Sequence, residues 1–148
     1  PSGVKMAGPY DYVTPGYWYT DTTRGGAFGF NTETGPGPQP VRYSSLKKML
    51  PEEDQWPIDN KQWQYHNGRH KFGTMEFYMK GFDNRYGKSD DIEDFSQYAQ
   101  VQNYEAMRPM YEAFAINQPN TTGIIQWMQN IKKLYYKRKI SYSKKMLL

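Results

Sequence analysis

The chain has 148 residues, the size of one ordinary domain or of a piece of a larger one. It contains no run of 18 apolar residues, no signal-peptide pattern and no cysteine, which excludes a membrane-spanning helix, disulfides and thiolate metal sites. The net charge of +4 comes from residues 131–148, which hold seven Lys or Arg and no acid, whereas 12 basic and 15 acidic residues give residues 1–130 a charge of −3. We therefore expect neither a nucleic-acid partner nor a membrane partner.

The N-terminal part of the chain alternates extended segments with Gly and Pro. Phe28 and Phe30 alternate with small residues, which predicts a short buried strand over residues 27–32. The Gly and Pro residues at 35–38 cannot continue a strand, so Glu33 lies where the strand gives way to a loop. The other elements expected before Pro51 are an extended segment at residues 3–13, an aromatic loop at 17–21 and a helix at 46–50 capped by Ser44 or Ser45.

The second half of the chain is predicted to be mainly helical. Residues 74–86 place their apolar side chains on one face of a helix that ends at Gly87. A longer helix is expected from Asp90 or Asp91 to about Asn117, with a kink at Pro109. The remaining segments are a long ordered loop with one helical turn at 52–73 and a second buried strand at 121–127. Because no hairpin turn joins the strands, this order predicts a parallel α/β sheet.

Several candidate residues also have simpler interpretations. Glu33 could be a solvated loop carboxylate, and each of Tyr10 and Tyr12 could be a core side chain. His66 and His70 are four residues apart, but no carboxylate with ligand geometry accompanies them, and zinc needs three or four ligands. We expect no metal site and no cofactor.

Four blocks of sequence resemble the catalytic barrel of glycoside hydrolase family 2, in its exo-β-D-glucosaminidase and β-mannosidase-like branch. The blocks are Gly-Pro-Tyr-Asp-Tyr-Val at 8–13, Gly-Gly-Ala-Phe-Gly-Phe-Asn-Thr-Glu-Thr-Gly-Pro-Gly-Pro at 25–38, Leu-Pro-Glu-Glu-Asp-Gln-Trp-Pro-Ile-Asp at 50–59 and Thr-Gly-Ile-Ile-Gln-Trp-Met at 122–128. The resemblance implies that residues 1–130 are the C-terminal part of a (β/α)8 TIM barrel, an incomplete barrel with about strands six to eight and their helices. It also implies a carbohydrate substrate, a secreted or periplasmic enzyme, and the rest of the barrel and accessory β-sandwich domains as partners.

The resemblance further implies roles for single residues. Glu33 would be the nucleophile of a retaining double displacement, whereas the acid/base at the end of strand four is absent from this chain. A tyrosine that hydrogen-bonds the nucleophile is expected at Tyr10 or Tyr12, with a slight preference for Tyr12. Trp127 is expected to form the floor of the sugar subsite, with a plain core role as the alternative, and Asn31 and Trp18 are expected to line the same pocket.

The resemblance ends after Asn130, where relatives continue with an Asn-Ala-Trp-Pro-like block. Residues 131–148 form a basic tail instead, which indicates either a frameshifted or truncated reading of a gene or a divergent native tail. The chain is thus expected to be an enzyme fragment that carries the nucleophile without its acid and is inactive alone. The alternative is a non-catalytic carbohydrate-binding or interaction module.

Overall fold

The computed structural model describes residues 3–66 and 75–127. Three strands, β1 (Val4–Lys5), β2 (Gly29–Thr34) and β3 (Thr121–Gln126), form one sheet in the order β1-β2-β3. Both pairs of neighbouring strands are parallel, so all three strands end at the same edge of the sheet. The predicted parallel α/β arrangement is confirmed. The basic tail predicted at 131–148 lies outside the described residues.

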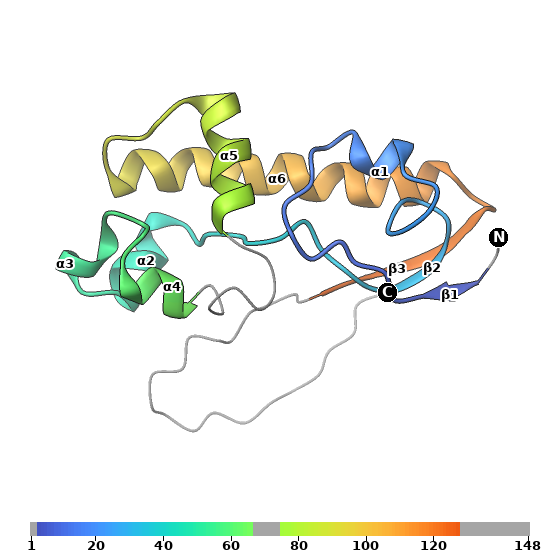
Figure 1. Cartoon of the computed structure of the whole chain (residues 1–148), viewed down its shortest axis with the longest axis horizontal. Helices are drawn as coiled ribbons and strands as arrows, with labels where there is room; N and C mark the ends of the chain where they lie inside the picture. The colour runs from blue at the N-terminus through green and yellow to red at the C-terminus, as the bar shows by residue number, and fades with distance from the viewer. Residues whose placement is uncertain (1–2, 67–74, 128–148) are drawn as a thin grey trace, which may run out of the picture.

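Helices connect and cover the strands (Figure 1). The short ones precede the centre of the chain: α1 (Tyr17–Thr20), α2 (Tyr43–Met49), α3 (Glu52–Gln55) and α4 (Lys61–His66). Two longer helices follow, α5 (Met75–Tyr86) and α6 (Ile92–Ile116). Among the described residues, none of these helices has the length and apolar character needed to cross a lipid bilayer.

The second half of the chain matches the prediction closely. Helix α5 ends at Gly87, which has a left-handed φ of 80°. The Asp91 side chain accepts a hydrogen bond from the Asp94 amide at 2.9 Å and so caps α6. The helix continues through Pro109 to Ile116, and β3 begins five residues later.

The first half needed several corrections. Only Val4–Lys5 of the predicted segment 3–13 pairs as a strand, and the predicted loop at 17–21 contains α1. Helix α2 begins at Tyr43 after an Arg42 N-cap, without the expected serine cap. The predicted loop at 52–73 contains α3 and α4 up to His66, and the rest of that segment lies outside the described residues. The sequence predicted one helical turn in that segment and none at 17–21; short helices such as α1 and α4 have no repeating apolar pattern from which they could be predicted.

Helix α6 joins two hydrophobic cores. Figure 1 shows the helix running from beside α5 to beside α1. Its first half packs with α2, α4 and α5 around Phe82 and Phe95, both fully buried. Its second half packs with α1 and the sheet around Trp18, Met110 and Phe114. One helix thus fixes the position of the α2–α5 layer relative to the sheet.

The face of the sheet turned away from α6 is exposed. Ile124 of β3 packs against the core around Met110, so its neighbour Ile125 points to the opposite side and is 52% exposed. Val4 and Met6 of the first segment are 77% and 68% exposed. The prediction that residues 121–127 form a buried strand was therefore right about the strand and wrong about its burial.

This exposed apolar face predicts weak cooperativity for the 148-residue chain on its own. Three strands cannot close a barrel, so sheet edges and apolar side chains remain in water. We expect a broad urea transition in which circular dichroism and tryptophan fluorescence do not coincide, together with binding of the dye ANS. A single sharp transition shared by both probes, without dye binding, would contradict this expectation.

Candidate functional site

The carboxyl ends of the three strands bring Tyr10, Glu33 and Trp127 to one edge of the sheet. The Gly8 amide donates to the Glu33 carbonyl at 3.3 Å, and the Trp127 amide donates to the Thr34 carbonyl at 2.7 Å. These two backbone bonds hold the segments after β1 and β3 against the end of β2. In parallel α/β proteins, this edge is where functional side chains gather.

Glu33 and Tyr10 interact directly at this edge. The Tyr10 phenol lies beside the Glu33 carboxylate: partial burial, and after it the charge of Glu33 and hydrogen bonding to it, raise the pKa of the Tyr10 phenol. Glu33 lies on β2 itself, one residue before its end, and is half-buried. Glu33 therefore has the Tyr10 phenol as a neighbour and is only partly removed from water.

Tyr12 makes a different set of contacts. Its ring lies edge-on to Tyr78 of α5, with the ring centroids 5.9 Å apart. It fits there because Gly81 has no side chain: a Cβ at that position would lie 2.3 Å from the Tyr12 ring. The contact with Glu33 that the sequence assigned to either tyrosine, with a preference for Tyr12, is made by Tyr10.

Asn31 and Trp18 do not line an open pocket beside Glu33. Asn31 is fully buried, and its amide nitrogen donates to the Gly8 carbonyl at 3.0 Å. Trp18 is also fully buried and belongs to the core around Met110. Both residues were predicted to line the sugar subsite, and the structure corrects both placements: Asn31 is enclosed by protein, and Trp18 lies in the core and lines a hollow away from Glu33.

Trp127 follows β3 directly and is 43% exposed. Its backbone lies against Gly35, where a Cβ would be 2.4 Å from the Trp127 carbonyl oxygen. The indole thus stands partly free at the same edge as Glu33. Its role as a sugar platform stays a prediction.

In the described part of the chain, no three His, Cys, Asp or Glu side chains gather as a metal site would require. His66 ends α4, and His70 lies outside the described residues. Of the two histidines considered as a metal pair, the structure therefore describes only His66.

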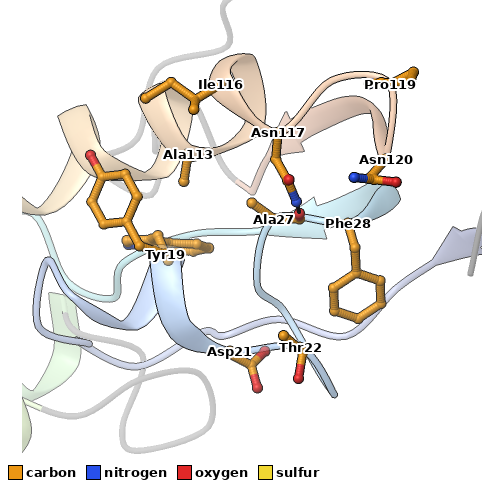
Figure 2. Close-up of a pocket in the computed structure, with 11 residues that line it drawn as sticks. Tyr19, Asp21, Thr22, Ala27, Phe28, Ala113, Ile116, Asn117, Pro119 and Asn120 are labelled. Atoms are coloured by element: carbon orange, nitrogen blue, oxygen red, sulfur yellow. Dashed lines mark hydrogen bonds between the residues drawn. The ribbon is translucent and has the colours of Figure 1, made fainter.

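A hollow of about 520 Å³ lies at the opposite, amino-terminal edge of the sheet (Figure 2). Figure 2 shows Tyr19, Phe28 and Asn117 around it, and the dashed line marks the bond from the Asn117 amide to the Ala27 carbonyl. Phe28 and Asn120, which also line it, immediately precede β2 and β3. The hollow is therefore separated from Glu33 by the length of the strands.

Asp21 organises the loop beside this hollow, a feature that the sequence analysis missed. Its carboxylate accepts hydrogen bonds from the Arg24 amide at 3.0 Å and the Gly26 amide at 2.8 Å. Burial alone would raise its pKa, but these donors and Thr23 lower the pKa of Asp21 to about 2. An Asp followed by Thr, Arg and two glycines was the available signal, since Asp side chains often bond backbone amides just downstream.

Lys5 closes the same loop from β1. Its ammonium group donates to the Arg24 carbonyl at 2.9 Å and the Gly26 carbonyl at 2.6 Å, and it lies 3.2 Å from the centre of the Phe28 ring. Burial lowers the pKa of Lys5 to about 8, and the Asp21 carboxylate partly offsets this effect. Lys5 thus connects the loop at 21–26 to β1, and Asp21 forms hydrogen bonds within the loop.

The chain is similar to exo-beta-D-glucosaminidases. It is 44% identical over 139 residues to an exo-beta-D-glucosaminidase of Arthroderma benhamiae, a match that covers 88% of this chain and 16% of that protein. The crystal structure of the Amycolatopsis orientalis exo-chitosanase CsxA matches with a TM-score of 0.73 and 36% identity, over 84% of this chain and 16% of that chain. A complex of that exo-chitosanase with PNP-beta-D-glucosamine matches with a TM-score of 0.74 and 36% identity over the same shares. No protein-family model matches the chain.

The chain therefore spans about a sixth of the length of these relatives. At 34–44% identity and TM-scores above 0.7, the described part has the fold of one segment of such an enzyme. The relatives are glycosidases by name, which supports the enzyme class expected from the sequence.

The low pKa of Asp21 predicts how the loop at 21–26 responds to acid. Because the folded pKa of about 2 lies below the ordinary value of 3.8, ionised Asp21 stabilises the loop fully above pH 3.8, and this stabilisation is lost as the pH falls through about 2. We expect the Asp21 carboxyl carbon to titrate near pH 2 by NMR, and the Gly26 amide resonance to follow it. In an Asp21→Asn variant the Gly26 amide should show no such titration. A midpoint near 3.8 in the parent chain would refute the hydrogen bonding described for this carboxylate.

Proposed function

We propose that this chain is the nucleophile-bearing segment of a retaining exo-β-D-glucosaminidase barrel of glycoside hydrolase family 2. The observation that carries the proposal is the Glu33 carboxylate at the carboxyl edge of a parallel sheet, beside the Tyr10 phenol. The fold match to exo-chitosanase CsxA supports the placement of this sheet within a larger barrel. Strands β1, β2 and β3 would then be barrel strands six, seven and eight.

In the proposed reaction, Glu33 attacks the anomeric carbon of a terminal sugar. The bond to the leaving oxygen breaks as a second carboxylic acid protonates that oxygen, and water later releases the sugar from Glu33 with the second group acting as base. A retaining pair requires the two carboxyl groups to lie about 5–5.5 Å apart. The second group would come from the part of the enzyme that precedes this segment, so the 148-residue chain alone would be inactive.

Tyr10 would serve the nucleophile in this scheme. Its hydroxyl would donate a hydrogen bond to one oxygen of Glu33 and leave the other oxygen for the substrate. Trp127, half-exposed at the same edge, would offer an apolar surface against one face of the sugar ring. We propose β-linked glucosamine as the sugar in preference to mannose, because the relatives are named for glucosamine.

The competing function is a carbohydrate-binding module without catalysis. Such a module would use Tyr10 and Trp127 as contacts and would not depend on the charge of Glu33. The two functions therefore predict different effects of a neutral residue at position 33: it abolishes hydrolysis in an enzyme and leaves sugar binding unchanged in a binding module.

The test is a chimeric enzyme in which residues 3–127 replace the matching segment of the Arthroderma benhamiae relative. We expect the parent chimera to hydrolyse PNP-beta-D-glucosamine and Glu33→Gln to lower kcat by about 10⁴-fold or more, because the variant lacks the attacking carboxylate. Glu33→Gly with added azide should regain turnover and yield the α-configured sugar azide, since azide attacks the face that Glu33 has left.

A folded parent chimera without activity, or a Glu33→Gln variant that keeps full activity, would refute the proposal. Glu112 offers a matched control, because it is an exposed carboxylate of α6 in an ion pair with Arg108. Glu112→Gln should leave kcat within about twofold of the parent, as surface ion pairs contribute little.

A further inference from the structure

We infer that Asn31 and Thr34 are positioning residues that set the geometry between Tyr10 and Glu33 through the carbonyl group of Gly8. The inference rests on the proposed function and adds two residues to it that make no contact with a substrate. It starts from an unusual concentration of buried hydrogen bonds on one backbone group.

Two fully buried side chains donate to the Gly8 carbonyl oxygen. The Asn31 amide nitrogen lies 3.0 Å from it and the Thr34 hydroxyl lies 2.6 Å from it. A carbonyl oxygen has two lone pairs, so these two donors satisfy it completely. The space around it is also closed by Gly25, where a Cβ would lie 2.2 Å from the same oxygen.

The same pair of segments is joined in the other direction. The Gly8 amide donates to the Glu33 carbonyl at 3.3 Å, and the Asn31 side-chain oxygen accepts from the Glu33 amide at 3.4 Å. Three hydrogen bonds thus connect Gly8 with residues 31–34, and a fourth lies within that segment, so that one side chain, Asn31, bonds to both Gly8 and Glu33. Tyr10 follows Gly8 by two residues.

This arrangement has a functional consequence that ordinary sheet pairing would not provide. Residues 6–10 lie beyond the end of β1, where backbone bonds to β2 and its end are few: the Gly8 amide donates to the Glu33 carbonyl at 3.3 Å and the Gly35 amide to the Pro9 carbonyl at 2.9 Å. Asn31 and Thr34 add two side-chain bonds to these, at the point where Tyr10 comes beside the Glu33 carboxylate. A displacement of about 1 Å in such a pair can cost on the order of 10²-fold in rate.

A purely structural role for the two buried residues makes a different prediction. If Asn31 only stabilises the fold, its loss and the loss of the Tyr10 hydroxyl act independently, and their effects on kcat multiply. If Asn31 acts by placing Tyr10, then Asn31→Ala already abolishes the contribution of the Tyr10 hydroxyl, and adding Tyr10→Phe lowers kcat no further. A double-mutant cycle separates the two cases.

The experiment uses the chimera described above, with PNP-beta-D-glucosamine as the substrate. We expect Tyr10→Phe and Asn31→Ala each to lower kcat by about 10- to 100-fold with KM changed less than about threefold, and the double variant to be no slower than the slower single variant. Multiplicative losses in the double variant would overturn the inference.

Because Asn31→Ala leaves the Gly8 carbonyl and the Glu33 amide each without one hydrogen bond, Thr34 supplies a second, milder test. Thr34→Val removes the hydroxyl at nearly constant shape and should lower kcat, whereas Thr34→Ser keeps the hydroxyl and should restore it. Thr32→Val is the matched control: its hydroxyl donates to the Lys5 carbonyl at 3.2 Å on the same pair of strands, away from Gly8. Equal kcat values for Thr34→Val and Thr32→Val would refute the role of Thr34.

The outcomes also separate this inference from the proposed function. In one outcome, Glu33→Gln inactivates the chimera while the substitutions at Tyr10 and Asn31 lower kcat independently. This outcome would support Glu33 as the nucleophile and refute only the positioning role of Asn31. An active Glu33→Gln variant would remove both.

Discussion

Parallel pairing of three strands is the constraint on which the rest of this structure depends. It sends the end of every strand to one edge, so the residues that follow β1 and β3 meet the last residues of β2. Tyr10, Glu33 and Trp127 are far apart in the sequence and come to one edge through this pairing. Long crossovers are the necessary cost of parallel pairing, and they account for most of the helices in the chain.

Helix α6 is the longest helix in the crossover between β2 and β3. It bonds back to the loop before α2 through Gln100 and Asn103, both of which donate to the Pro40 carbonyl at 2.8 and 3.0 Å. It covers one face of the sheet with its second half and anchors the α2–α5 layer with its first half. The opposite face of the sheet has no such cover among the described residues, as expected of one segment of a closed barrel.

Polar groups that are buried at one edge of the sheet and partly buried at the other decide the fine geometry of both edges. At the carboxyl edge, Asn31 and Thr34 converge on one carbonyl oxygen. At the amino edge, Asp21 and Lys5 bind the backbone of the loop at 21–26. Polar groups removed from water must be paired, so each pairing also fixes a loop that the strands alone would leave loose.

The sequence by itself determined the parallel α/β class, the long helices and the position of Glu33 near a strand end. Apolar periodicity, Gly and Pro breaks and a capping Asp are local signals, and they appear in the order of the residues. Only the tertiary structure decided that Tyr10 and not Tyr12 meets Glu33, and that Asn31 and Trp18 are enclosed. Those outcomes depend on which way a side chain turns and on what packs against it, as with Tyr12, whose ring fits α5 because Gly81 leaves space there. Contacts between residues distant in sequence leave no periodic trace, so no reading of the chain alone could have supplied them.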